Sequence, residues 1–495
     1  MKRRPIPISS LPAWSKLNDI NFYDVRVQTL DASGHGLAAE RALSSANTYD
    51  QPRLLSVPKD LILSNEAVEE YAKVDGDFRE LLHVAGGKST RGDVMLFLIM
   101  QLTIVGLDGG HLVGVSNPWT EYVRLLPDAV PVPTTWTESQ RELLIGTSLE
   151  SALDAKSAAL TREFEELRER SIDLTWCVRA WWEKESLSLD DWVLVDSWYR
   201  SRNLELPQSG ESMVPCLDMA NHSAEANAYY EQTSTGDVVL LLRPDKELSK
   251  DDEITISYGS EKSAAEMLFS YGFIDPRTTT TSLILPIHPF SDDPLAKAKV
   301  ACFPSRPIMR ISTDAFSDVS WSSPFIHLMS LNEEDGLAFR MLQQTDGARS
   351  SLRTLWQGRD VSDATHRFDE LVRDHPLRDV FSLRAVALLE ARVHEQLQRL
   401  HTSDELLEPT GADDDGLYAS AMLLRRLETQ VLERVSQLLH AQNTDLLARP
   451  SVVEYLASMN ADQHVDPAAA AAAAAATDLT TRTDDAENDA QDDFS

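Results

Sequence analysis

Two stretches near the middle of the chain, PCLDMANHSAEAN at Pro215–Asn227 and DEITISYGSEKSAAEMLFSYGFI at Asp252–Ile274, decide the interpretation of the sequence. Between them, the alternating segment Asp237–Leu242 predicts a strand, and the turn-rich run Pro244–Asp252 follows it. The two stretches bring polar and aromatic side chains close together in sequence: Asp218, Asn221, His222, Tyr258, Tyr271 and Phe273. They therefore form the candidate functional region of the chain.

The size of the chain leaves room for two or three domains. It has 495 residues, of which 42% are hydrophobic, and this is enough for sizeable cores. Only three cysteines occur, widely spaced, so neither a disulfide framework nor a CxxC metal site is predicted. Cysteine usage of this kind favours a reducing compartment.

The charge of the chain limits its partners. The net charge is −33, which argues against binding to nucleic-acid phosphates as the main activity. It suits a basic protein partner, through electrostatic complementarity that raises the encounter rate. Simple solubility explains the same charge equally well, and both interpretations stay open.

The sequence also bears on location. The N-terminus, MKRRPIPISS, is basic, but no apolar stretch follows it, so no secretory signal is predicted. The longest strongly apolar stretch, Val94–Leu107, is too short to span a bilayer and is expected to be a buried helix. We expect a protein of the cytoplasm, the nucleus or both, without a membrane partner, and a monomer.

Strand patterns surround a helical region in the first part of the chain. Phe22–Leu30 alternates, SGHGLAA predicts a turn, and Arg53–Val57 predicts another strand before Pro58. The pattern is helical from about 65 to 191, strand-like from Met213 to Tyr258, and helical again at Ser263–Ser270. We therefore expect an N-terminal extension over 1–19 and a β-rich domain over 20–275, with a helical insertion at about 65–191.

A second, mostly helical domain is expected over 276–461. Ser282–Pro286 predicts a strand, and helix is expected from Asp335 onward. Apolar residues repeat at spacings of three and four around Val386–Leu400 and Leu424–Leu438, which predicts two long amphipathic helices with an acidic loop between them. The alanine-rich and acidic stretch at 462–495 is expected to be disordered. The predicted fold class is α+β.

Common catalytic patterns do not explain the candidate region. Asn221-His222 has no second His or Cys at ligand spacing, so no metal site is predicted. The chain has neither a G-x-S-x-G elbow nor a G-x-x-x-x-G-K-[ST] phosphate loop. The Gly-His-Gly at Gly34–Gly36 is too short for a dinucleotide fingerprint.

The two stretches, in this order, resemble the centre of a SET-domain protein methyltransferase of the Rubisco large-subunit lysine methyltransferase-like class. Further segments resemble that class in the same order: GHGLAA at Gly34–Ala39, LLSVPKDLILS at Leu54–Ser64, WTEYVRLLP at Trp119–Pro127, LIGTSLE at Leu144–Glu150 and SRN at Ser201–Asn203. The likeness covers roughly residues 20–460. It implies a SET domain with a helical insertion, followed by a helical substrate-binding domain. It also implies an enzyme that uses S-adenosylmethionine to methylate lysine on a non-histone protein.

The resemblance implies a role for each matching residue. Backbone groups of His35, Gly36 and Leu37 would contact the methionine end of the cofactor, and Arg202 would pair with its carboxylate, a contact that suits a guanidinium. Asn221, His222 and Tyr258 would bind the cofactor, and Phe273 would pack on its adenine. Tyr258 would also be the catalytic tyrosine. Asp218 and Tyr271 would lie near the substrate side chain. One departure is Pro52-Arg53, which stands where the class often has a cofactor-contacting Glu, so that contact is not carried over.

Two alternatives stay open. A relative in this class methylates histidine and uses an Asn two positions after the Arg, where this chain has Leu204. An apolar Leu204 in the substrate site suits the aliphatic stem of lysine better than an imidazole, although Asn203 is only one position away. The other alternative is a catalytically silent SET fold that binds a protein partner.

For an active enzyme, a narrow, tyrosine-lined channel beside a sulfonium would help catalysis by lowering the pKa of a target lysine.

Overall fold

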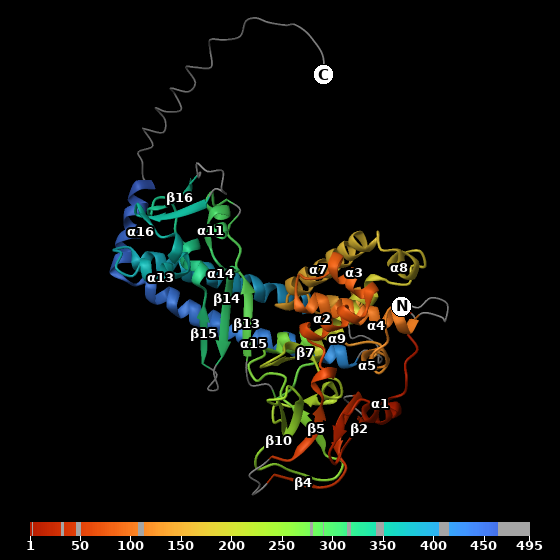
Figure 1. Cartoon of the computed structure of the whole chain (residues 1–495). Coiled ribbons are helices and arrows are strands. Elements are labelled where there is room, and N and C mark those ends of the chain that lie inside the picture. The colour runs from red at the N-terminus through yellow and green to blue at the C-terminus, as the bar shows by residue number, and fades with distance from the viewer. Residues whose placement is uncertain are drawn as a thin grey trace, which may run out of the picture. The chain divides into compact units, whose positions relative to one another are not determined.

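The computed structural model describes residues 1, 3–30, 34–45, 51–106, 113–277, 281–290, 292–313, 318–342, 351–404 and 415–463. The chain divides into two compact units (Figure 1). The first, here called the N-terminal unit, comprises 1–284, 311–320 and 396–433; the second comprises 285–310, 321–395 and the chain from 434 onward. Both helices and strands are well represented, so the predicted α+β class is confirmed.

The N-terminal unit is built around two four-stranded sheets. One has the order β1-β5-β10-β9, formed by Asn21–Phe22, Arg53–Val57, Val238–Leu242 and Ala228–Gln232. The other has the order β2-β3-β12-β8, formed by Val25–Leu30, Gly34–Ala39, Glu253–Ile256 and Asn221–His222. Two short pairs accompany them: β4 (Leu43–Ser44) with β11 (Glu247–Leu248), and β6 (Asn203–Leu206) with β7 (Gly210–Met213).

The strands predicted around Phe22–Leu30, Arg53–Val57 and Asp237–Leu242 are confirmed, with small shifts at their ends. The turn predicted for SGHGLAA is wrong for Gly34–Ala39, the part of this segment that the structure describes. Gly34–Ala39 is strand β3, which pairs with all six residues of β2, from Leu30↔Gly34 to Val25↔Ala39. Burial of Gly36–Ala39 in the sheet prevails over the turn preference of the glycines.

The pairing of β12 with β8 joins the two stretches of the candidate region. These strands run parallel, with Thr255 opposite Asn221 and Ile256 opposite His222. The side chain of Asn227 clamps this arrangement, because its Nδ2 donates to the Glu253 carbonyl at 2.8 Å and its Oδ1 accepts from the Thr255 amide at 3.0 Å. Strand β12 also pairs with β3, so three segments distant in sequence meet at one sheet.

Helices fill the region between β5 and β6 in sequence: α2 (Asn65–Val74), α3 (Gly76–Ala85), α4 (Thr90–Gly106), α5 (Pro118–Tyr122), α6 (Glu138–Glu142), α7 (Leu149–Ser171), α8 (Thr175–Cys177) and α9 (Leu189–Arg202). Helix α4 is buried along Val94–Leu102 and contacts α9, as predicted for a buried helix (Figure 1). The helical pattern runs beyond the expected limit at 191, since α9 ends only at Arg202. Strand β6 starts at the next residue.

A buried carboxylate fixes the end of α9. Asp196 is fully buried, and its Oδ1 accepts from Lys156 Nζ and from Arg91 Nε, each at 2.8 Å. Arg200 lies 3.2 Å from its other oxygen. Despite its burial the pKa of Asp196 is lowered by these three cations, so the group stays ionised. The network holds the helix that carries Arg202.

The later part of the chain has more strand than expected. Its elements are β13 (Thr281–Pro286), α11 (Ala296–Cys302), β14 (Ile308–Thr313), β15 (Val319–Ser322), α12 (Pro324–Met329), β16 (Leu337–Leu342), β17 (Ser351–Trp356), β18 (Arg359–Asp360), α13 (Phe368–Leu371), α14 (Arg378–Asp404), α15 (Asp415–Leu447) and α16 (Pro450–Gln463). Two helices of the earlier part complete the set: α1 (Leu11–Leu17), before β1, and α10 (Ala264–Tyr271), after β12. The predicted strand at Ser282–Pro286 and the two long helices are confirmed. The prediction of helix from Asp335 onward is wrong for its first part, because β16 there pairs with β17 from Leu337↔Trp356 to Leu342↔Ser351.

Two predicted segments fall largely outside the described residues. They are the acidic loop predicted at Ser403–Gly416, of which 405–414 lie outside, and the tail from 464 to the end. The described ends of that predicted loop, 403–404 and 415–416, are helical and belong to α14 and α15. The first two residues assigned to that tail, 462 and 463, belong to α16. None of the helices in the described ranges combines the length and the apolar character needed to cross a bilayer.

Replacing Asn227 with Ala should lower the free energy of unfolding of the N-terminal unit by about 2 kcal/mol, because two backbone groups of β12 lose their partners. The matched control is Asn21→Ala, at an exposed residue whose side chain bonds one exposed carbonyl. The control should change stability by less than about 0.5 kcal/mol. Urea unfolding followed by tryptophan fluorescence measures both, and equal stabilities for the two variants would contradict the role given to Asn227.

Candidate active site

A cavity of about 300 Å³ opens in the N-terminal unit where α9, β6, β12 and α10 meet. Five of the residues predicted for the site line it: Arg202, Leu204, Asp218, Tyr258 and Tyr271. Its wall also includes side chains that sequence reasoning did not single out, among them Glu205, Glu211, Tyr230 and Lys262. The cavity thus combines an ion pair, an apolar side and several phenol rings.

One side of the cavity is formed by Arg202 and Asp218. Arg202 Nε lies 3.5 Å from Asp218 Oδ2, and its Nη1 donates to Ser201 Oγ at 2.7 Å. The Nε atom is buried and makes no hydrogen bond with the described part of the chain. Burial raises the pKa of Asp218, an effect that the Arg202 charge opposes. Arg202 therefore keeps one buried donor for an acceptor that the chain itself does not supply.

A strained turn and a tyrosine from the insertion hold Asp218 in place. Cys216 has φ +68, a left-handed conformation that is unusual for a residue other than glycine, and it begins the 3-10 helix Leu217–Met219. The hydroxyl of Tyr122, at the end of α5, accepts from the Cys216 amide at 2.8 Å and donates to Asp218 Oδ1. Tyr122 was missed from sequence, since nothing near it signals a contact with a residue almost a hundred positions away.

Tyr258 and Tyr271, which also line the cavity, belong to an aromatic cluster. The ring centroids of Tyr258 and Tyr271 are 4.6 Å apart, and those of His222 and Tyr258 are 5.2 Å apart. Phe273 joins the cluster, 6.1 Å from His222 and 6.4 Å from Tyr258. The Tyr258 hydroxyl donates to the Ala220 carbonyl at 3.0 Å. Burial raises the pKa of Tyr258, so the phenol keeps its proton at neutral pH.

His222 supports Tyr258 and is itself neutral. Its Nδ1 accepts from the Tyr258 amide at 3.1 Å, and its Nε2 lies 3.6 Å from Asp275 Oδ2. Burial lowers the pKa of His222, although Asp275 acts in the other direction. The described residues contain no group of three or more His, Cys, Asp and Glu side chains arranged to hold a metal ion.

The glycine segment of β3 lies against Asn221. Asn221 Nδ2 donates to the His35 carbonyl at 3.3 Å and to Glu253 Oε1 at 2.8 Å. A Cβ added at Gly36 would lie 2.8 Å from this Nδ2 and 2.5 Å from Leu30 Cδ1, so a larger residue would require both side chains to move. Leu37 is fully buried.

The predicted site residues thus fall into two adjoining groups. Arg202, Leu204, Asp218, Tyr258 and Tyr271 line the cavity, whereas the remaining residues do not: His35, Gly36, Leu37, Asn221, His222 and Phe273. Hydrogen bonds or ring contacts tie His222 and Phe273 to Tyr258 and Asn221 to His35. The individual roles given to these residues stay predictions.

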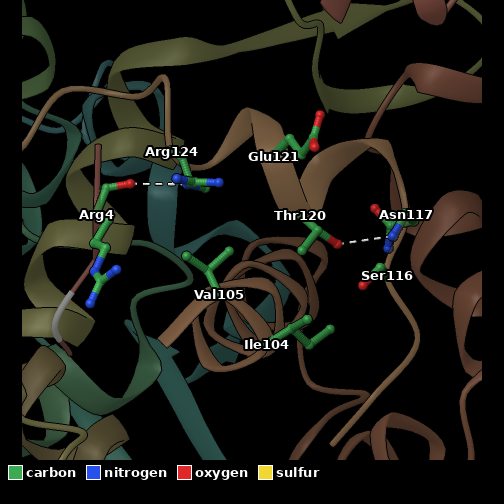
Figure 2. Close-up of a pocket in the computed structure, with 8 residues that line it drawn as sticks. All are labelled: Arg4, Ile104, Val105, Ser116, Asn117, Thr120, Glu121 and Arg124. Carbon is green, nitrogen blue, oxygen red and sulfur yellow. Dashed lines mark hydrogen bonds between the residues drawn. The ribbon is translucent and has the colours of Figure 1, made fainter. Parts of the chain in front are cut away.

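A second cavity, of about 430 Å³, contains none of the predicted residues. Figure 2 shows Ile104 and Val105 on its floor, with Arg124 Nε donating to the Arg4 carbonyl at 2.9 Å at one side. Thr120 Oγ1 accepts from the Asn117 amide at 2.9 Å at the other.

Comparison with known proteins agrees with this geometry. The family model described as cytochrome c lysine N-methyltransferase 1 matches residues 201–299. SET domain-containing protein 8 of Schizosaccharomyces pombe is 27% identical over 445 residues, which is 88% of this chain and 96% of the relative. The chloroplastic Rubisco large-subunit N-methyltransferase of Nicotiana tabacum is 26% identical over 51% of this chain and 48% of its own length.

A solved structure shows the same fold. The SET domain of LSMT bound to lysine and AdoHcy superimposes with a TM-score of 0.63 at 20% identity, over 89% of this chain and 92% of that chain. The order of sheets, insertion and C-terminal helices is therefore that of a SET-fold protein. Together with the sequence relatives, this likeness makes the chain similar to the Rubisco large-subunit methyltransferase-like class and supports a protein-lysine methyltransferase of SET fold that uses S-adenosylmethionine.

Proposed function

We propose that this methyltransferase acts on a lysine side chain of a basic, non-histone protein. The observation that carries the proposal is the cavity lined by Leu204, by Tyr258 and Tyr271, and by the Arg202–Asp218 pair. Leu204, Tyr230 and Tyr258 pack as hydrophobic side chains against the core. A cavity with this lining suits the four methylene groups of lysine, which prefer apolar surroundings while the nitrogen keeps a polar neighbour.

The residues beside the cavity fit S-adenosylmethionine. The unsatisfied Arg202 Nε suits the carboxylate of the methionine end, and a buried unmet donor is costly without such an acceptor. Backbone groups of His35–Leu37 would contact the methionine end, beside the side chain of Asn221 that packs against Gly36. Asn221, His222 and Phe273 would complete the binding site, with Phe273 against the adenine. When bound, the cofactor supplies a methyl group on a positively charged sulfur.

The chain's own groups would prepare the target amine. Tyr258 stays protonated and fixed by its bond to the Ala220 carbonyl, so it can orient the nitrogen but cannot act as a phenolate base. The aromatic walls exclude water and disfavour the ammonium form, whose pKa in water is about 10.4. Holding the nitrogen in line with the methyl group supplies the proximity effect on which the transfer depends.

Histidine is a second candidate target, because Asn203 lines the same cavity as Leu204. An amide at this place could bond an imidazole nitrogen. Leu204 contributes an apolar surface instead, and it is this surface that favours lysine.

The basic nature of the partner is supported by the net charge of −33 and by the exposed Glu205 and Glu211 at the cavity wall.

Labelling identifies the substrate. Purified protein and S-adenosylmethionine with an isotopically labelled methyl group are added to a cell extract, and mass spectrometry locates the label. We expect methyl-lysine on a basic non-histone protein. Methyl-histidine would favour the second candidate, and label confined to histones or to small molecules would contradict the proposal.

The Tyr258→Phe variant should methylate that substrate at least about tenfold more slowly, because the amine loses its orienting hydroxyl. Cofactor affinity should stay within about twofold. The control is Tyr23→Phe at a residue with 38% exposure outside the cavity, which should keep the full rate. Full activity of Tyr258→Phe would remove this hydroxyl from the mechanism.

The contact with Arg202 is tested by calorimetry with two ligands. Decarboxylated S-adenosylmethionine should bind the wild type at least about tenfold more weakly than the intact cofactor, since a charge-assisted hydrogen bond is lost. In Arg202→Met the two ligands should bind equally well, because the partner of the carboxylate is missing. Arg162→Met, on the exposed face of α7, is the control. A preference for the carboxylate that survives in Arg202→Met would assign this contact to another residue.

A further inference from the structure

Lys262 is the residue just before the N-cap of α10, and it forms part of the cavity wall. It is half-buried, and its Nζ donates to the carbonyl oxygen of Tyr258 at 2.8 Å. The same nitrogen lies 5.5 Å from the ring centroid of Tyr271. The ammonium is therefore fixed between the two tyrosines that form the aromatic side of the cavity.

Local structure holds the stem of Lys262 in this position. Gly259 has φ +132, and a Cβ at this residue would lie 3.2–3.4 Å from Nζ, Cγ and Cδ of Lys262. Glycine thus provides the space along which the stem runs. The next residue, Ser263, is held in a capping box with Glu266, so the backbone on the other side is fixed as well.

Lys262 brings a positive charge that the described residues do not neutralise with an ion pair. The other charged or titratable groups on the cavity wall come from α9, β6, β7, the 3-10 helix, β9, the segment after β12, and α10: Arg202, Glu205, Glu211, Asp218, Tyr230, Tyr258 and Tyr271. Arg202 and Asp218 pair with each other, and Glu211 accepts from the Tyr199 hydroxyl at 2.7 Å. Glu205 and Glu211 are exposed, so water screens their charges more than that of Lys262.

We infer that Lys262 is a positioning residue that keeps the target lysine in its neutral, nucleophilic form. This inference rests on the proposed function. A cation beside the cavity disfavours a second cation inside it, so the bound target ammonium releases its proton to solvent more readily. The freed lone pair forms the new bond from nitrogen to the methyl carbon, while the electrons of the broken carbon–sulfur bond stay on sulfur. By holding the Tyr258 carbonyl, Lys262 also fixes the residue that orients the amine.

The charge of Lys262 already affects another group of the site. Burial is the main reason that the pKa of His222 is lowered, and the positive charge of Lys262 adds to it. His222 contacts the same tyrosine, Tyr258, from the neighbouring strand. An amine held between Tyr258 and Tyr271 would lie within reach of the same field.

The test is the pH dependence of kcat at saturating concentrations of the cofactor and of the substrate identified by labelling. This profile reports groups that titrate in the complex, here the bound lysine. In Lys262→Met the midpoint of the rising limb should move up by roughly one pH unit, the effect of one charge at roughly 10 Å in a medium of effective dielectric constant about 20. Lys262→Arg keeps the charge and should keep the wild-type midpoint within about 0.3 units. A merely structural role would lower kcat without moving the midpoint.

Lys262→Gln serves as a second neutral variant if Lys262→Met does not fold, and Lys250→Met, at an exposed residue outside the cavity, is the matched control. Cofactor affinity, measured by calorimetry, should be unchanged in all of them. Equal midpoints in the wild type and both neutral variants would overturn the inference and leave the proposed function intact. If the wild type neither binds the cofactor nor methylates protein, both fail.

Discussion

The site depends on a two-residue parallel pairing. Strand β8 contributes only Asn221 and His222, yet its register with Thr255 and Ile256 of β12 brings the two separate stretches of sequence together. So short a ladder cannot hold itself, and Asn227 supplies two further hydrogen bonds to the backbone of β12. Because β12 also pairs with β3, the glycine segment around Gly36 comes into contact with Asn221. The proposed cofactor site and the proposed substrate cavity therefore both depend on one alignment of strands.

Buried polar groups place the remaining parts. Asp196 anchors the end of α9, and Tyr122 anchors Asp218, so that Arg202 meets Asp218 with one donor unused. In a protein interior a donor without an acceptor is unfavourable, and a strained φ such as that of Cys216 costs free energy as well. Such costs tend to persist at functional sites, where binding of the ligand recovers them. The surrounding helices of the insertion provide the rigidity that maintains this arrangement.

Local patterns predicted much of this structure, and long-range contacts account for what they missed. Val238–Leu242 and the helices around Leu389 and Val431 have strong periodicity, so their type could be predicted from sequence alone. The strand at Gly34–Ala39 could not, because its conformation depends on burial between β2 and β12 and not on its own glycines. Nor could β16, which is stabilised by pairing with a strand that follows it.

The candidate site shows the same division. Arg202, Asp218 and Tyr258 stand in motifs that carry the family likeness, and the structure brings them to one cavity. Tyr122 stands in the segment Trp119–Pro127 and Lys262 in the stretch Asp252–Ile274, but neither motif assigns a role to these two side chains. Their contacts with Asp218 and Tyr258 exist only once the insertion and α10 have packed. A residue that acts through another is hard to find from sequence, because its own neighbours in the chain do not reveal its partner.

A crystal structure of the full chain with S-adenosylhomocysteine and a lysine peptide of its substrate is the most direct measurement of the central claim. The account predicts the cofactor carboxylate at Arg202 Nε, the adenine beside Phe273, and the lysine stem between Leu204 and Tyr258 with its nitrogen directed at the sulfur. Cofactor bound elsewhere, for instance in the cavity around Arg124, or a lysine that enters away from Tyr258, would contradict it.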